Sequence, residues 1–422
     1  MIELERPPIH EKAILARLVL PNQSDEDVED SLDELRQLAW TAGAEVVQTF
    51  VQHRDRPDPA TLIGRGKAGE IRQAVEENEA DMVIFDSDLG PAQGVKLEDL
   101  IGVKVVDRTQ LILDIFAQRA QTNEGKHQVE LAQLQYMLPR LTGRGSVMRQ
   151  QGGIGVRGPG EQKLEVDRRI IRRRIQRLEK EIENIRKSRH VQRRKRTSET
   201  VGTVALVGYT NAGKSSLLNA ITGADVFVED KLFATLDPRA RRCKLPSGRE
   251  IVLSDTVGFI RSLPHSLVAA FRATLEEVNE ADLLLVVADV AHPHVREHLA
   301  SVRSVLEEIH ADEKPVVYVF NKLDIAPETG DLRQILRGPG VRVGVSAKTG
   351  EGLEKLLEEI DRQLASTLRH VVLRVPQGNG SVVARVHESG RVLDQHYEDN
   401  TVVIEAEIDR ALEGALAEFI ER

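Results

Sequence analysis

A glycine-rich segment, residues 208–216, has the residue types and spacing of a phosphate-binding loop. An apolar run, 204–207, precedes it and a second apolar segment, 217–221, follows, so the segment would connect a buried strand to a helix. Backbone N–H groups at such a helix N-terminus attract anions, and a chance glycine-rich turn would not have both flanking elements. The predicted nucleoside triphosphate site comprises Gly208, Tyr209, Thr210, Asn211, Ala212, Gly213, Lys214, Ser215 and Ser216.

Two later segments indicate which base is bound. Each follows a predicted strand, 316–320 or 341–345, at the strand edge where open α/β sheets bind ligands. The Asp324 carboxylate can accept two hydrogen bonds from guanine, whereas adenine would leave it desolvated and unpaired. A backbone N–H in the second segment suits guanine O6. We therefore predict GTP and GDP as ligands, with base contacts from Asn321, Lys322, Leu323, Asp324, Ser346, Ala347 and Lys348.

The chain between these segments has residues suited to a γ-phosphate and Mg²⁺. A predicted strand, 251–254, leads into Asp255, which would hold the Mg²⁺ shell, and the Gly258 N–H would contact the γ-phosphate. Ser215 and Thr235 are the predicted hydroxyl ligands of Mg²⁺, with Thr235 in a loop that GTP would order. Catalysis is assigned to Lys214, Thr235, Asp255 and Gly258. The nucleotide site would also include Phe233, Ala234, Leu236, Asp237, Thr256 and Val257.

Residue 259 departs from the commonest GTPase pattern. Phe259 occupies the position where many GTPases have a glutamine that orients the attacking water, and an apolar ring cannot do this. We therefore expect slow intrinsic hydrolysis, completed by a partner or a monovalent cation. Asn211 resembles the loop asparagine of potassium-stimulated GTPases, which makes K⁺ a second candidate cofactor beside Mg²⁺. The alternative is an asparagine that stabilises the turn.

Composition is that of a soluble globular protein of several domains, with 422 residues, 41% hydrophobic and 30% charged. No apolar run approaches the ~18 residues needed to span a bilayer. The N-terminus lacks the pattern of a secretory signal, and the single cysteine, Cys243, cannot form an internal disulfide. We expect a cytoplasmic protein without a membrane span that acts as a monomer.

Charge is unevenly distributed along the chain. Residues 140–196 hold 19 Lys and Arg against 6 Asp and Glu, a net charge of +13. The remaining residues hold 39 basic and 61 acidic side chains, a net charge of −22. A basic segment in an otherwise acidic chain indicates a polyanionic partner, and we interpret it as RNA.

Residues 10–120 alternate predicted strands (13–20, 45–51, 82–86, 103–107) with predicted helices (24–43, 67–78, 94–100, 109–120). This pattern predicts a small parallel α/β domain. Ser24 is the expected N-cap of the first helix, and Gly43 is expected to end it. A glycine-rich turn, 64–69, could hold a phosphate of a second nucleotide, but a single glycine-rich turn between a strand and a helix is usually only a turn.

Residues 122–196 have the apolar spacing of two long helices. We predict an antiparallel coiled-coil hairpin, with a loop at 142–160 rich in glycine and arginine. Arginine forms bidentate contacts with phosphates, and glycine allows close approach of the backbone to RNA. A solvated helix face and a flexible tip are the alternatives. The predicted seam residues are His127, Leu131, Leu134, Leu138, Leu141, Ile171, Ile175, Leu178, Ile182 and Ile185, and the candidate RNA contacts are Arg144, Arg149, Arg157, Arg168, Arg169, Arg172 and Arg173.

The predicted fold class is α/β, with a P-loop GTPase domain, an N-terminal parallel α/β domain, an antiparallel coiled-coil hairpin and a small C-terminal α/β module. The expected boundaries are 1–120, 121–198, 199–368 and 369–422. In the last region we predict strands at 371–375, 391–397 and 401–408 and a helix at 411–420. This module has no reactive constellation, so its function cannot be inferred from its residues.

With these motifs placed, the chain resembles the HflX-type GTPases. The resemblance rests on residues 63–67 (IGRGK), 107–109 (DRT), 113–120 (LDIFAQRA), 130–134 (ELAQL), 157–161 (RGPGE), 164–165 and 167–169. It implies binding to the large ribosomal subunit or the whole ribosome, with the hairpin loop probing ribosomal RNA near the peptidyl-transferase region. It also implies that the GTP form helps to separate stalled ribosomes. Phe259 agrees with the family, and some relatives are credited with ATP hydrolysis through the N-terminal domain.

Two other functions fit the same residues. One is a GTPase that checks maturing RNA during ribosomal subunit assembly. The other is an RNA-binding or remodelling protein whose nucleotide site is regulatory. Dissociation of mature ribosomes by the protein with a non-hydrolysable GTP analogue would favour the splitting function over assembly.

Overall fold

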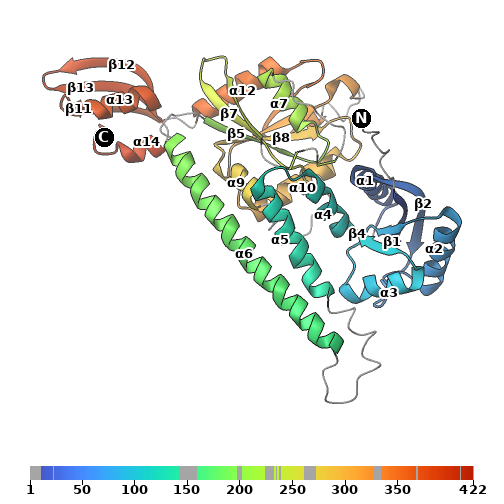
Figure 1. The fold of residues 1–422 in the computed structure, drawn as a ribbon. Coiled ribbons are helices and arrows are strands. Elements are labelled where there is room, and N and C mark those ends of the chain that lie inside the picture. The colour runs from blue at the N-terminus through green and yellow to red at the C-terminus, as the bar shows by residue number, and fades with distance from the viewer. Residues whose placement is uncertain are drawn as a thin grey trace, which may run out of the picture. The chain divides into compact units, whose positions relative to one another are not determined.

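The computed structural model describes most of the chain, and its internal contacts divide the chain into two units. One unit contains residues 1–185 with 229–237 and 261–272, and the other contains 186–228, 238–260 and 273–422. Figure 1 shows the helices and strands along the chain. The described residues are 11–21, 23–141, 159–196, 202–223, 232–233, 235–236, 239–260, 272–326, 334–366, 369–408 and 410–421.

The first unit contains a four-stranded parallel sheet in the order β2-β1-β3-β4. Helices alternate with the strands, and one face of the sheet packs against α2 and α3 through Ile14, Ile71, Val83, Phe85 and Leu97. This confirms the predicted parallel α/β fold. The elements are β1 Glu11–Val19, α1 Asp25–Ala42, β2 Ala44–His53, α2 Arg65–Asn78, β3 Met82–Phe85, α3 Pro91–Ile101, β4 Lys104–Asp107 and α4 Arg108–Arg119.

The first helix, α1, begins and ends at the residues that the sequence predicted. The Ser24 side chain accepts a hydrogen bond from the Asp27 N–H, which satisfies one of the free donors of the first turn. Gly43 ends the helix with φ +95°, a left-handed conformation that costs glycine little. Local sequence therefore determines both ends of α1.

Asp107, at the end of β4, attaches the next helix to this sheet. Its carboxylate accepts hydrogen bonds from the Tyr136 hydroxyl at 2.7 Å and from Arg140 at 2.9 Å, both on α5 (Asn123–Arg140). It also accepts from the backbone N–H of Leu89 at 3.1 Å. The Asp107 side chain is 1% exposed, so these bonds compensate for its desolvation.

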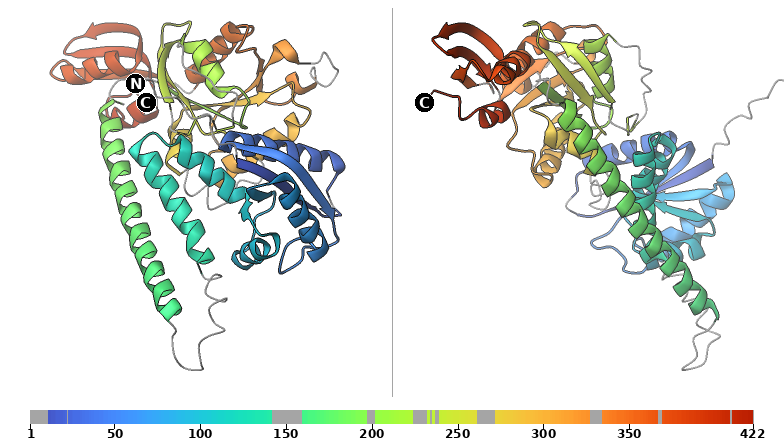
Figure 2. Two further views of the ribbon diagram at one scale, coloured as in Figure 1. Left: turned by 45° about the vertical axis from the view of Figure 1, so that its right-hand side comes forward. Right: turned by 60° about the vertical axis from the view of Figure 1, so that its left-hand side comes forward.

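Helix α5 is followed by a long helix, α6 (Pro159–Arg196), which runs antiparallel beside it (Figures 1 and 2). Arg174 on α6 donates two hydrogen bonds of 2.7 Å to Glu130 on α5. The Nδ1 atom of His127 on α5 lies 3.9 Å from a carboxylate oxygen of Glu181 on α6. Leu178, which lies between these two contacts along α6, is fully buried. The other predicted seam residues are partly buried, and the coiled-coil packing itself stays a prediction.

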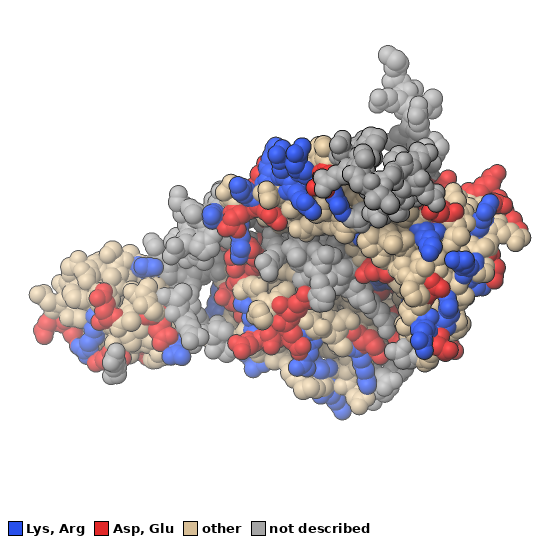
Figure 3. All heavy atoms as spheres, turned by 90° about the horizontal axis from the view of Figure 1, so that it is seen from below, with Lys and Arg blue, Asp and Glu red and all other residues tan. Residues whose placement is uncertain are grey.

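The candidate RNA-binding arginines fall into two groups. Arg169, Arg172 and Arg173 are exposed on α6, and Arg168 is partly buried. Arg144, Arg149 and Arg157 lie outside the described residues. Acidic and basic side chains are interspersed over the molecular face in Figure 3.

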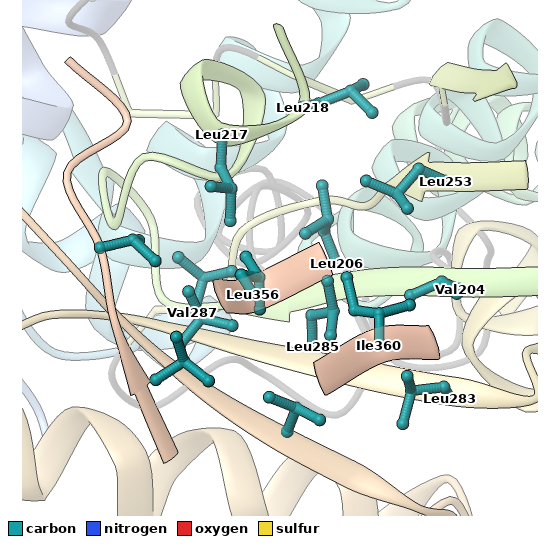
Figure 4. Packing of buried hydrophobic residues seen from close by; sticks show 14 of the residues in the cluster. Val204, Leu206, Leu217, Leu218, Leu253, Leu283, Leu285, Val287, Leu356 and Ile360 are labelled. Carbon is teal, nitrogen blue, oxygen red and sulfur yellow. The ribbon is translucent and has the colours of Figure 1, made fainter. Parts of the chain in front are cut away.

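The second unit contains a six-stranded sheet in the order β10-β9-β8-β5-β7-β6, in which only β6 is antiparallel to its neighbour. Its core includes Val204, Leu206, Leu253, Leu285 and Leu356 (Figure 4). The strands predicted around 204–207, 251–254, 316–320 and 341–345 are present. The elements are β5 Gly202–Gly208, α7 Lys214–Thr222, β6 Arg239–Lys244, β7 Glu250–Asp255, α9 Arg272–Glu280, β8 Leu283–Asp289, α10 Val295–Glu308, β9 Val316–Asn321, η2 Leu323–Ile325, β10 Val341–Gly344 and α12 Leu353–Ser366.

The C-terminal residues form a three-stranded antiparallel sheet in the order β11-β13-β12. The three strands were predicted, but helix α13 was not. The predicted helix 411–420 was too long, because the chain turns after Ala415 and the backbone of Ile420 pairs with Leu373. The elements are β11 Arg369–Pro376, α13 Gly380–Ser389, β12 Arg391–Glu398, β13 Thr401–Ile408 and α14 Arg410–Ala415.

Among the described residues, no helix combines the length and the apolar character that crossing a bilayer requires.

Candidate nucleotide-binding site

The glycine-rich loop connects the end of β5 to the start of α7, as its sequence predicted. A Cβ atom on Gly208 would lie 2.2 Å from the carbonyl oxygen of Val287, so only glycine fits beside β8. Gly213 is the N-cap of α7 with φ +88°, and a Cβ there would lie 2.2 Å from the Asn321 amide nitrogen. Both glycines are therefore required by close contacts with neighbouring strands.

Lys214 is the first residue of α7 and is buried, with 6% of its surface exposed. Its ammonium group donates hydrogen bonds to the carbonyl oxygens of Gly208 at 3.1 Å and Tyr209 at 2.8 Å. Burial lowers the pKa of Lys214 to about 8, an effect that the negative charge of Asp255 partly opposes. The loop thus binds the Lys214 ammonium group through two of its own carbonyl oxygens. Phosphate oxygens of a nucleotide would supply the remaining hydrogen-bond acceptors of this group.

Ser215 and Asp255 bring a hydroxyl and a carboxylate together beside this lysine. The Ser215 hydroxyl donates a 2.6 Å hydrogen bond to Asp255, the last residue of β7, which is fully buried. Oxygen ligands of these two kinds are the ones that Mg²⁺ prefers. The donor set therefore fits a magnesium ion bound through Ser215, with Asp255 next to it.

The segment after Asp255 is held against the loop by backbone hydrogen bonds. The Thr210 N–H donates to the Phe259 carbonyl oxygen at 2.7 Å, and the Phe259 N–H donates to Gly208 at 3.0 Å. A Cβ on Gly258 would lie 2.8 Å from the Thr210 Cα and 3.0 Å from the Lys214 ammonium nitrogen. Gly258 therefore lies beside the cation that would bind the outer phosphates, and Phe259 is 2% exposed.

The candidate guanine-binding residues lie together at the ends of β9 and β10. Asn321 is buried, donates to the Ala212 carbonyl oxygen at 3.0 Å and accepts from the Ala347 N–H at 3.0 Å. It thereby connects the phosphate-binding loop to the segment after β10. The Ser346 hydroxyl donates to Asp324 at 2.7 Å, which orients the carboxylate predicted to read the base.

Asp289 is a residue of this region that the sequence analysis did not single out. It ends β8, and its carboxylate lies 2.7 Å from the ammonium nitrogen of Lys322. The Ala291 N–H donates to the other carboxylate oxygen at 3.0 Å. Lys322 adopts a left-handed backbone conformation with φ +69°. In the sequence, Asp289 is an acidic residue at the end of an apolar run. This pattern is too common to indicate that Lys322 would be its partner.

The loop predicted to hold the second hydroxyl ligand is only partly described. Phe233, Thr235 and Leu236 are buried, and the Phe233 ring contacts Phe116 of α4 edge to face at 4.6 Å. Ala234 and Asp237 lie outside the described residues. The roles of these five residues in binding nucleotide and Mg²⁺ stay predictions.

A phosphate-binding loop after a central parallel strand, with an asparagine and an aspartate at the end of β9, defines the class of P-loop GTPases. Four family models match consecutive parts of the chain. They are described as GTP-binding GTPase N-terminal (residues 29–117), GTP-binding GTPase Middle Region (119–196), 50S ribosome-binding GTPase (203–322) and HflX C-terminal domain (334–418).

Curated relatives match over nearly the whole chain. The chain is 48% identical to the GTPase HflX of Caldanaerobacter subterraneus subsp. tengcongensis, over 97% of this chain and 94% of that protein. It is 46% identical to the GTPase HflX of Escherichia coli (strain K12), over 90% and 88%. The chain belongs to the HflX family of GTPases. Among solved structures, it is similar to a GTP-binding protein from Sulfolobus solfataricus in complex with GDP, with 27% identity, TM-score 0.44 and coverage of 84% of this chain and 99% of that one.

Proposed function

We propose that this GTPase binds the large ribosomal subunit in its GTP form and promotes dissociation or rescue of stalled ribosomes. The observation that carries the proposal is the position of Gly258 beside the Lys214 ammonium group, with its segment bonded to the phosphate-binding loop. A γ-phosphate bound at this lysine would contact the segment directly, so GTP and GDP would favour different conformations of it. The description of the family model over residues 203–322 supports a ribosomal partner.

In this proposal Ser215 and Thr235 would hold Mg²⁺, and the Asp255 carboxylate would accept a hydrogen bond from a water molecule bound to the ion. When bound, the ion supplies positive charge to the β- and γ-phosphate oxygens. Lys214 adds charge to the same phosphates, and the Gly258 N–H donates to the γ-phosphate. Asn211 has φ +59°, a conformation that asparagine tolerates in turns, so a turn-forming role accounts for it without K⁺.

The two antiparallel helices α5 and α6 supply the surface that would contact ribosomal RNA. Exposed arginines on α6, including Arg169, Arg172 and Arg173, can form bidentate contacts with phosphates. We propose that the chain consists of four functional regions, which are residues 1–120, 121–198, 199–368 and 369–422. We also propose that the protein acts in the cytoplasm as a monomer.

Co-sedimentation with purified large subunits tests this function. The parent protein should sediment with subunits in the presence of a non-hydrolysable GTP analogue, and less with GDP or without nucleotide. Lys214→Ala and Thr235→Ala should lose this nucleotide dependence. Equal sedimentation of the parent protein in all three states would contradict the proposal. Subunit binding without dissociation of mature ribosomes would instead favour a role in subunit assembly.

A further inference from the structure

Thr210, in the phosphate-binding loop, has a buried hydroxyl group that forms no hydrogen bond within the protein. The residue is 7% exposed. Among the buried side-chain atoms of the described residues, Thr210 Oγ1 is the hydroxyl oxygen without a hydrogen-bonding partner. Burying a hydroxyl group in this way costs free energy. An unsatisfied polar group at a binding site therefore indicates a contact with the ligand.

Other buried hydroxyl groups of the same unit have partners within the protein. The Thr256 hydroxyl donates to the Leu206 carbonyl oxygen at 2.7 Å, and the Ser346 hydroxyl donates to Asp324 at 2.7 Å. Both of these donor residues are fully buried. The folded chain thus provides acceptors for hydroxyl groups that it buries elsewhere, whereas the hydroxyl of Thr210 is left for a group outside the protein.

Thr210 lies beside the residues predicted to bind the γ-phosphate. Its N–H donates to the Phe259 carbonyl oxygen at 2.7 Å, which fixes its backbone. A Cβ atom on Gly258 would lie 2.8 Å from Thr210 Cγ2 and 3.0 Å from the Lys214 ammonium nitrogen. The Thr210 side chain and the lysine therefore border the same space next to Gly258. Rotation about χ1 can bring the hydroxyl to the position of the methyl group without any backbone movement.

The position of Thr210 favours the γ-phosphate over the other two phosphates of the nucleotide. In a phosphate-binding loop the backbone N–H groups contact the α- and β-phosphates, and the lysine reaches the β- and γ-phosphates. Thr210 is next to Gly258, whose N–H would contact the γ-phosphate. Ionised phosphate oxygens accept hydrogen bonds, and a hydroxyl group can donate one. Such charge-assisted bonds are stronger than bonds between neutral groups.

We propose that the Thr210 hydroxyl donates a hydrogen bond to the γ-phosphate of GTP and thereby increases the preference of the site for GTP over GDP. GDP has no γ-phosphate, so the hydroxyl group stays unsatisfied when GDP is bound. A site with a buried polar group discriminates against a ligand that lacks the matching group. The inference rests on the nucleotide site and does not depend on the proposed ribosomal function.

Two substitutions separate the hydroxyl group from the methyl group. Thr210→Val removes the hydroxyl and nearly keeps the shape of the side chain, whereas Thr210→Ser keeps the hydroxyl and removes the methyl. Calorimetry on the full chain measures the affinities for GDP and for a non-hydrolysable GTP analogue. Thr210→Val should bind the analogue about ten- to hundredfold more weakly and GDP within about twofold of the parent protein. Thr210→Ser should keep the parent ratio of the two affinities.

Thr222→Val is the matched control for the loss of a hydroxyl group. The Thr222 hydroxyl donates to the Leu218 carbonyl oxygen at 2.7 Å within α7, so it is satisfied by the protein itself. This variant should keep both nucleotide affinities. The melting temperature of nucleotide-free Thr210→Val should be no lower than that of the parent protein, because valine buries no unsatisfied hydroxyl group. That measurement also verifies that the variant is folded.

Three results would overturn the inference. An unchanged affinity of Thr210→Val for the GTP analogue excludes a hydrogen bond to the γ-phosphate. Equal losses of affinity for the analogue and for GDP indicate a contact with the α- or β-phosphate or a rearranged loop. A loss in Thr210→Ser without a loss in Thr210→Val assigns the effect to packing of the methyl group against Gly258. These measurements use nucleotide alone, so their outcome is independent of the sedimentation that tests the proposed function.

Discussion

Lys214 shows how the nucleotide site places a charge where solvent is excluded. In the unfolded chain this lysine would have the ordinary lysine pKa of 10.5, whereas in the folded protein its pKa is about 8. Between these values the unfolded state binds more protons, so the free energy of unfolding should increase as pH rises. Below pH 8 the buried charge costs on the order of 3 kcal/mol, which bound phosphates would offset.

Proton uptake on GDP binding tests the lowered pKa of Lys214. Phosphates bound at Lys214 should raise its pKa, so GDP binding at pH 8.5 should take up about 0.8 proton, against about 0.1 at pH 7.0. GDP affinity should fall about fourfold between these pH values. Calorimetry in buffers of different ionisation enthalpy measures both quantities. Lys322→Gln removes another lysine near the site and should keep the uptake, whereas uptake that is independent of pH would refute a depressed pKa.

A second prediction concerns the contribution of Asp289 to GDP binding. Its 2.7 Å ion pair fixes Lys322, which lies in the segment predicted to bind guanine. Asp289→Asn should weaken GDP binding about three- to tenfold, because the lysine side chain loses its orientation. Glu307→Gln, which breaks the exposed pair with Arg303, is the matched control and should leave affinity unchanged. A double variant with Lys322→Gln should be no weaker than Lys322→Gln alone if the two residues act as a pair.

At the scale of elements, α6 is bonded to α5 through Arg174 and Glu130, and Leu178 is the fully buried apolar side chain among the described residues of α6. Leu178→Ala should lower the free energy of local opening of this helix pair by about 2–4 kcal/mol, because it leaves a cavity. Ile170→Ala on the same helix, 57% exposed, should change it by less than about 0.5 kcal/mol. Hydrogen exchange of the α5 and α6 amides measures the difference, and equal protection in both variants would contradict the packing.

The elements also show how far the sequence predicts this structure. The parallel strands of the first sheet were predictable because apolar runs alternate with capped helices, as at Ser24 and Gly43. Strand β6 was not predicted, because its basic sequence lacks the apolar pattern of a strand and its pairing with β7 depends on tertiary structure. A role for Asp324 in binding the base could be predicted from its motif and stays a prediction, whereas Asp289 acquires a partner only through the fold.

At the scale of the whole molecule, opposite charges are segregated along the chain, with +13 on residues 140–196 and −22 on the remainder. Such a distribution favours one polyanion at a basic surface while the acidic remainder repels it elsewhere. The charge balance is therefore consistent with the proposed contact between residues 140–196 and RNA.

This distribution predicts strong salt dependence of subunit binding. Raising NaCl from 50 to 200 mM should weaken association with the large subunit at least about tenfold, because counterions compete for each phosphate contact. GDP affinity, which depends on a buried site, should change less than about twofold under the same conditions. Sedimentation and fluorescence titration measure the two affinities. A subunit affinity that is insensitive to salt would indicate an interface without phosphate contacts.

Phe259 has a consequence for the timing of the reaction. Its ring is buried and its backbone is bonded to the phosphate-binding loop, so residue 259 offers no polar atom to activate a water molecule. Any group that performs this step must come from another part of the chain or from a bound partner. GTP would then remain unhydrolysed until that group is supplied. The lifetime of the complex with a partner would therefore be set by the partner and not by the intrinsic rate of hydrolysis.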